Sequence, residues 1–126
     1  MTESPLRILI VEDHEDTRKY LRLYLEQSGH SVMSVNSVRQ AAELLPTAEC
    51  DVVISDISLA DGSGWDLLSG INSRRPPYAI AMSGFGTLAD SNRSKAVGYR
   101  HHLVKPIDPD VLDQVLEEAR RERDER

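Results

Sequence analysis

The chain has 126 residues, a single cysteine and a formal net charge of −6. This length is typical of one domain with its own hydrophobic core, and the acidic balance argues against nonspecific binding to nucleic acid or to an acidic membrane surface. No apolar run is long enough for a signal peptide or a membrane span, and Cys50 has neither a disulfide partner nor zinc-ligand spacing around it, so we expect a protein of the reducing cytoplasm.

Short apolar runs along the chain predict five strands. They cover residues 6–11, 31–35, 52–56, 78–82 and 99–104. The run that begins at Val52 and stops at Asp56 has no regular polar alternation, which is typical of a strand buried on both faces of a parallel sheet.

A helical pattern follows each predicted strand. Ser37 and Asp108 are expected to cap helices at their N-termini, and Gly29 and Gly98 to end helices. The helix over residues 88–97 is expected to be weak, because it is rich in polar residues with modest helix propensity. The apolar faces of the first and last helices are expected to contain Tyr20, Leu21, Tyr24 and Leu25, and Val111, Leu112, Val115, Leu116 and Ala119.

Five alternations of strand and helix predict an α/β fold, a doubly wound (βα)5 unit with a five-stranded parallel sheet covered on both faces. We expect the flavodoxin-like strand order 2-1-3-4-5, with a crevice between the first and third strands. Residues 1–126 are expected to form a single domain with a core from about residue 6 to 119. Residues 120–126 read as a charged helical tail without the apolar positions of a coiled coil.

Polar residues stand at the carboxyl ends of four predicted strands. Glu12 and Asp13 follow the first, Asp56 ends the third, and Ser83 and Lys105 follow the fourth and fifth. The predicted order brings the three carboxylates into one crevice, where they repel one another unless a hard cation such as Mg²⁺ neutralises them. An aspartate can act as a nucleophile toward phosphoryl groups, and an ammonium or hydroxyl can contact phosphoryl oxygens. Each residue alone has an ordinary structural interpretation, so the inference depends on their joint placement.

With these residues, and with Pro106 after Lys105, the sequence from about Leu6 to Ala119 resembles the receiver domain of two-component response regulators. The resemblance implies that Asp56 takes a phosphoryl group from a histidine of a sensor histidine kinase or of a histidine phosphotransfer protein. It implies that Lys105 contacts this group, that Ser83 moves toward it, and that the Lys105–Pro106 peptide is often cis. The implied Mg²⁺ ligands are Glu12, Asp13, Asp56 and the backbone carbonyl of Ser58.

The resemblance also implies a signalling protein and not an enzyme. Such a domain phosphorylates itself, dephosphorylates itself slowly, and passes a conformational shift to an output domain or a downstream protein. The charged tail is not followed by an output domain, so we expect either a stand-alone regulator or a domain cut from a larger protein.

The sequence departs from the family pattern at two positions. Three residues before Lys105 the family usually has Tyr or Phe, which couples to the Ser or Thr; here it has His102, which we interpret as a surface histidine while leaving a switch role open. A polar, glycine-bearing loop is expected after Asp56; in it, Ala60 stands where a proline is common and is expected to loosen the loop slightly. His14, beside the acidic pair, is expected to be a solvated residue at a helix start.

Three other classes of protein compete with the receiver domain. A flavin-binding domain needs a loop after the first strand that cradles phosphate, whereas residues 12–16 here would repel it. An aspartyl phosphatase typically has a second Asp two residues after the nucleophile, where this chain has Ser58. The third alternative is a pseudo-receiver that binds a partner without phosphorylation. The complete set of Glu12, Asp13, Asp56, Ser83 and Lys105 argues against it, but His102 leaves it open.

Overall fold

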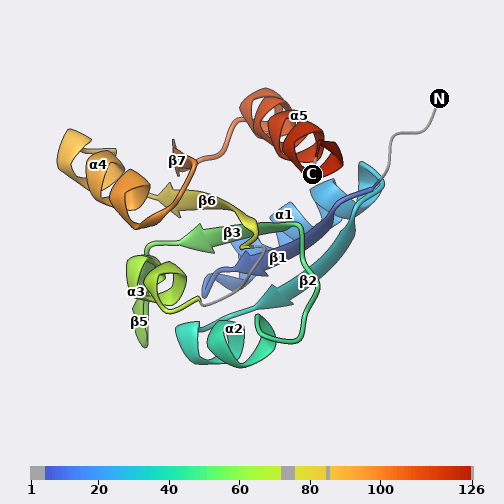
Figure 1. Cartoon of the computed structure of the whole chain (residues 1–126). Helices are drawn as coiled ribbons and strands as arrows, with labels where there is room; N and C mark the ends of the chain where they lie inside the picture. The colour runs from blue at the N-terminus through green and yellow to red at the C-terminus, as the bar shows by residue number, and fades with distance from the viewer. Residues whose placement is uncertain (1–4, 72–75, 85, 126) are drawn as a thin grey trace.

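The structure is a computed structural model and describes residues 5–71, 76–84 and 86–125 (Figure 1). Its main sheet consists of β1 (Arg7–Val11), β2 (Ser31–Val35), β3 (Val52–Asp56), β6 (Tyr78–Ser83) and β7 (His101–Val104). A small hairpin, β4 (Ser58–Leu59) and β5 (Gly62–Ser63), lies between β3 and the helix that follows. The helices are α1 (Glu15–Gln27), α2 (Val38–Leu44), α3 (Gly64–Ser69), α4 (Leu88–Val97) and α5 (Pro109–Asp124).

The main sheet is parallel throughout and has the order β2-β1-β3-β6-β7. Because β4 and β5 form a separate antiparallel pair, β6 and β7 are the fourth and fifth strands of the main sheet. The predicted doubly wound α/β fold and its order 2-1-3-4-5 are therefore confirmed. The hairpin was expected to be a loop, and two-residue strands are too short to give a sequence pattern.

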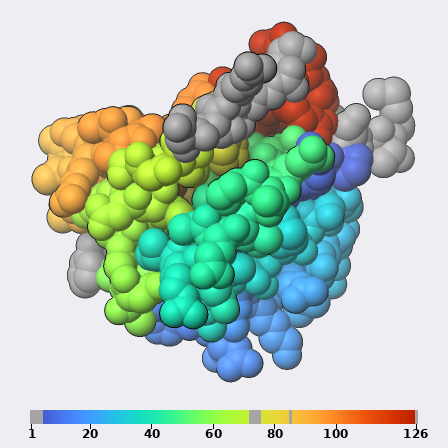
Figure 2. All heavy atoms as spheres, turned by 60° about the horizontal axis from the view of Figure 1, so that its bottom comes forward, coloured from blue at the N-terminus to red at the C-terminus, as the bar shows by residue number. Residues whose placement is uncertain are grey.

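Two hydrophobic clusters cover the two faces of the sheet. On one face, α1 and α5 pack on alternate residues of β1 and β3, such as Ile10 and Ile54. On the other face, α2 and α3 pack on the intervening residues, such as Val11 and Val53, and lie side by side (Figures 1 and 2). Every residue of β3 is buried, which agrees with the prediction of a strand covered on both faces. Within the described ranges no helix has the length and apolar character needed to cross a bilayer.

The expected helix ends are confirmed. The Ser37 hydroxyl accepts a hydrogen bond from the Gln40 amide, and the Asp108 carboxylate accepts one from the Asp110 amide. Gly29 and Gly98 have φ angles of 96° and 115°, the left-handed region that glycine enters without strain.

Two parts of the predicted apolar faces are wrong. Tyr20 on α1 is 53% exposed and Val111 on α5 is 39% exposed, whereas the other predicted residues of these faces are buried or partly buried. A helix face that covers a sheet is narrower than the apolar stripe of the sequence, so residues at its margin stay in contact with solvent. The strand bounds also differ: β6 extends to Ser83, and β7 begins at His101, after Tyr99.

Gly64, the first residue of α3, allows that helix to approach β3 closely. A Cβ atom at this position would lie 2.4 Å from the backbone oxygen of Asp56. The start of α3 therefore lies directly against the end of β3. A glycine is therefore required here for steric reasons.

We predict that Gly64→Ala lowers the free energy of unfolding by about 1–3 kcal/mol, because the added methyl group overpacks this contact. Urea denaturation followed by circular dichroism measures the change. Gly84→Ala is the control, because a Cβ there meets nothing within 4 Å. Equal stability of the two variants would contradict the steric explanation.

Candidate functional site

The predicted site residues meet at the edge of the sheet where the parallel strands end. Asp56 and Ser83 are the last residues of β3 and β6, which pair with each other. Glu12 follows β1, and Lys105 follows β7. Parallel pairing of β1 with β3, and of β6 with β7, places these four strand ends on one side of the sheet.

Lys105 lies between two carboxylates that are almost fully buried. Its ammonium nitrogen donates to Asp56 Oδ2 at 2.8 Å and also to Glu12 Oε1. The side chain of Glu12 is 0% exposed and that of Asp56 is 7% exposed. Buried carboxylates are costly unless they are paired, so Lys105 stabilises both of them.

The pKa values of Glu12 and Lys105 both rise, for different reasons. Burial raises the pKa of Glu12 and outweighs the opposite effect of the hydrogen bonds from Lys105 and from the His14 amide. Burial disfavours the charge on Lys105, but its hydrogen bonds to Asp56 and Glu12 prevail and raise the pKa of the ammonium. Lys105 therefore stays charged at this edge of the sheet.

The loop after β3 is attached to the site by two hydrogen bonds from backbone amides. The Ser58 amide donates to Asp56 Oδ1 at 3.1 Å, and the Ala60 amide donates to Asp13 Oδ2 at 3.0 Å. The first bond holds the Asp56 carboxylate on the side away from Lys105. The second brings Asp13 to the loop that contains Ser58.

The oxygen atoms at this edge suit a hard cation. Among the described residues, ligand atoms of Glu12, Asp13 and His14 lie within 4.8 Å of one another, and Asp56 is not part of that cluster. The Lys105 ammonium stands between Glu12 and Asp56. The donor set of Glu12, Asp13, Asp56 and the Ser58 carbonyl agrees in kind with the oxygen ligands of Mg²⁺. His14 has a side chain that is 79% exposed and stands at the N-cap of α1, as expected of a solvated helix start.

His102 is not the solvated surface histidine that the sequence suggested. Its Nε2 atom lies 2.8 Å from the Ser83 hydroxyl oxygen, and its Nδ1 atom lies 2.8 Å from that of Ser94 on α4. The Trp65 indole nitrogen donates to the same Ser94 oxygen at 2.8 Å. His101, the preceding residue of β7, instead contacts Glu118 on α5. The sequence contains one signal for this difference between His101 and His102. Neighbouring residues of a strand point to opposite faces of the sheet, so the two histidines have different surroundings.

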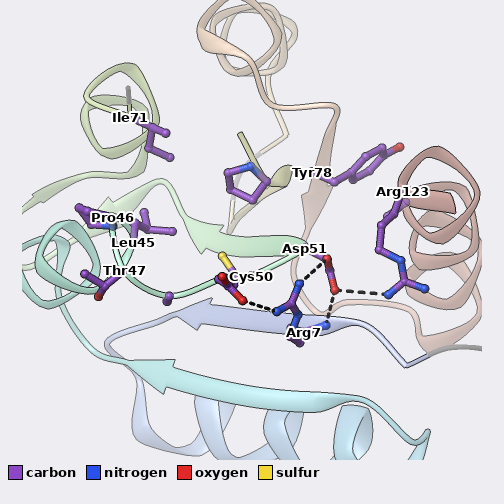
Figure 3. A pocket seen from close by; sticks show the side chains of 13 residues that line it. Arg7, Leu45, Pro46, Thr47, Cys50, Asp51, Ile71, Tyr78 and Arg123 are labelled. Atoms are coloured by element: carbon purple, nitrogen blue, oxygen red, sulfur yellow. Dashed lines mark hydrogen bonds and ion pairs between the residues drawn. The ribbon is translucent and has the colours of Figure 1, made fainter. Parts of the chain in front are cut away.

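A hollow of about 570 Å³ lies at the opposite edge of the sheet, where β1, β3 and β6 begin (Figure 3). Its charged groups pair with one another, since Arg7 and Arg123 each lie 3.4 Å from an oxygen of Asp51. Burial raises the pKa of Cys50, which lines the hollow, to about 11, so its thiol stays protonated near neutral pH. This hollow is separate from the candidate site.

These features define a class: a doubly wound α/β domain with an acidic cluster and a lysine at the carboxyl edge of its sheet. Residues 8–117 match the model of the response regulator receiver domain, and the chain belongs to this family. It is 33% identical over 119 residues to the response regulator protein PilR of Pseudomonas aeruginosa and 30% identical over 120 residues to the transcriptional regulatory protein GlrR of Escherichia coli. Each alignment covers 94% of this chain and 27% of the relative, so the chain spans about a quarter of their length.

The solved structures agree with this assignment. A CheY-like response regulator receiver domain from Methanospirillum hungatei has a TM-score of 0.88 and 26% identity, and the match covers 98% of this chain and 100% of that one. As a receiver domain, the chain is regulatory and is not a classical enzyme, and receiver domains work with histidine kinases and output domains. The family typically uses Mg²⁺ at an acidic site, and this chain has an acidic cluster at that edge. The Lys105–Pro106 peptide is cis, as the resemblance suggested.

Asp61 fixes the β4–β5 hairpin to the start of α2. Its two carboxylate oxygens accept hydrogen bonds from the amides of Val38 and Arg39 at 2.9 and 3.1 Å. These two amides lower the pKa of Asp61 below its usual value. The contact was not apparent from the sequence, because it joins residues 23 and 22 positions apart.

We predict that the amide proton shifts of Val38 and Arg39 titrate together in acid. Because the folded pKa of Asp61 is lowered, its stabilising contact is present above the ordinary aspartate pKa and is lost as the pH falls through the folded value. The midpoint should therefore lie below the usual aspartate value. A pH series of amide spectra measures this, with Asp61→Asn as the control that loses the titration. A midpoint at or above the ordinary aspartate pKa in the wild type would contradict the stabilising role of the hydrogen bonds from Val38 and Arg39 to Asp61.

Proposed function

We propose that this receiver domain accepts a phosphoryl group on Asp56, from a phosphohistidine of a sensor histidine kinase or of a histidine phosphotransfer protein. The observation that carries the proposal is the Asp56 carboxylate itself. It is almost buried at the end of the central strand, with one oxygen bound by Lys105 and the other by the Ser58 amide. A carboxylate fixed at both oxygens is oriented to attack in one direction.

In the proposed reaction a carboxylate oxygen of Asp56 bonds to the phosphorus atom, and the phosphorus–nitrogen bond to the donor imidazole breaks. The electron pair of that bond stays on the imidazole, which takes up a proton. Lys105 would turn its ammonium toward the transferred phosphoryl oxygens, a role that suits a mobile point charge. Water would later hydrolyse the acyl phosphate slowly, because Ser58 supplies no second carboxylate two residues after Asp56.

The metal in this proposal is Mg²⁺. Glu12, Asp13, Asp56 and the Ser58 carbonyl would hold it, and when bound it would offset the negative charges of the attacking carboxylate and the anionic donor. The support is chemical: these donors are all oxygens. Glu12 and Asp56 have only one ammonium between them, so the cluster has an excess of negative charge.

We further propose that phosphorylation shifts the conformation of the face formed by α4, β7 and α5. The only buried residue of α4 is Ser94, so this helix has little apolar contact to hold it. Its first residue, Leu88, is 77% exposed. A helix with so little buried surface is a suitable element for a population shift. Residues 1–126 are proposed to act as one such domain, with a core from about 6 to 119 and a charged helical end.

The experiment is incubation with acetyl phosphate and Mg²⁺ followed by intact mass measurement. We predict a gain of one phosphoryl group that requires Mg²⁺, is absent in Asp56→Asn, and persists in the control Asp66→Asn, which removes an exposed carboxylate on α3. Hydrogen exchange on the same samples should differ across residues 86–104.

Absence of phosphoryl transfer under every condition would contradict the proposal. The chain would then be a pseudo-receiver, an interaction module that works without phosphorylation. A phosphoryl gain with unchanged exchange across residues 86–104 would support the acceptor chemistry and contradict the conformational shift.

A further inference from the structure

A chain of polar contacts runs from α3 to the end of β6. It joins the Trp65 indole nitrogen to Ser94, Ser94 to Nδ1 of His102, and Nε2 of His102 to Ser83, each over 2.8 Å. Ser94 is 0% exposed. The contacts with Ser94 and Ser83 use the two ring nitrogens of His102, so this chain of contacts requires the histidine.

The direction of the hydrogen bonds follows from what each group can donate. The indole nitrogen of Trp65 only donates, so Ser94 accepts from it. The Ser94 hydroxyl hydrogen, buried in turn, needs an acceptor, because an unpaired buried donor is costly. A serine in a helix often donates to the carbonyl four residues earlier, but in the described part of the chain the only acceptor that Ser94 contacts is Nδ1 of His102.

The same count of donors and acceptors determines which ring nitrogen of His102 carries the hydrogen. If Nδ1 accepts the hydrogen of Ser94, it carries none of its own, and the neutral ring has its hydrogen on Nε2. Nε2 therefore donates to the Ser83 oxygen. All the hydrogen bonds run in one direction, from Trp65 to Ser83, and the hydroxyl hydrogen of Ser83 is not given to His102.

We propose that Ser94 and Trp65 are positioning residues, which hold His102 in the tautomer with hydrogen on Nε2 so that Ser83 donates its hydroxyl hydrogen toward the phosphoryl group on Asp56. In the opposite tautomer Nε2 would accept that hydrogen and take it away from the phosphoryl oxygen. This inference rests on the proposed function of Asp56. It adds a physical link between the phosphoryl site and α4, since Ser94 is the buried residue of that helix.

The tautomer can be measured in the protein without any phosphoryl group. In ¹⁵N-histidine-labelled protein, the shifts of the ring nitrogens report which of them carries hydrogen, and His102→Gln assigns one of the four histidines. We expect hydrogen on Nε2 of His102 in the wild type and a mixture of tautomers in Ser94→Ala. The control Ser91→Ala lies on the same helix, has no side-chain hydrogen bond among the described contacts, and should match the wild type. Hydrogen on Nδ1 in the wild type would overturn the inference, whether or not the variants fold.

Binding of beryllofluoride with Mg²⁺, a stand-in for the phosphoryl group, gives the functional readout. Ser94→Ala should weaken it about three- to tenfold, the effect of one impaired hydrogen bond, and Ser91→Ala should leave it unchanged. Equal binding by Ser94→Ala and the wild type would overturn the inference while leaving the proposed function intact. Failure of the wild type itself to bind would count against the proposed function, whereas the tautomer measurement would still stand.

Discussion

Two almost buried carboxylates share one ammonium at the carboxyl edge of the sheet, and the rest of the site depends on this arrangement. Glu12 and Asp56 end up below the surface because the strands that lead to them are covered on both faces. Neither charge is tolerated there without a partner. Lys105 supplies that partner from β7, two strands away from β3 in the sheet. The cluster still has an excess of negative charge, which favours a bound cation and would repel an anionic phosphoryl donor in the absence of one.

The packing around this cluster is unequal. On one side of the sheet, α1 and α5 contribute large apolar residues to a continuous core. On the other side, α3 approaches Asp56 closely at Gly64, whereas α4 buries a single serine. The strand β3 is therefore held on both faces, whereas α4, which lies against β7 and α3, has little buried surface to hold it in place. Such a division suits the proposed function, in which the phosphoryl site would stay fixed while the surface at α4 changes.

Much of the fold could be predicted from the sequence, because the information is local. The apolar runs placed the strands, the alternation of strand and helix gave a parallel sheet, and the known geometry of such sheets gave the strand order. The same rule brought Glu12, Asp56 and Lys105 to one edge. Their roles in phosphoryl transfer and Mg²⁺ binding stay predictions.

What could not be predicted depends on contacts between distant segments. The position of Lys105 between Glu12 and Asp56 is set by side-chain reach, which the sequence pattern does not contain. His102 was misjudged because the exposure of a residue on an edge strand depends on the helix that covers it, and α4 places Ser94 against its ring. The contacts of Asp61 with α2, and the exposure of Tyr20 and Val111, likewise follow from how helices pack on the sheet.

In the proposed function, the carboxylate that is phosphorylated is the one held by Lys105 and the Ser58 amide. Borohydride reduces an acyl phosphate to an alcohol, so it converts a phosphorylated aspartate into homoserine. Protein treated with acetyl phosphate and Mg²⁺, reduced and then mapped by peptide mass spectrometry, should show this conversion at Asp56 and at no other carboxylate. Conversion at Asp13 or another acidic residue, with Asp56 unchanged, would contradict the account.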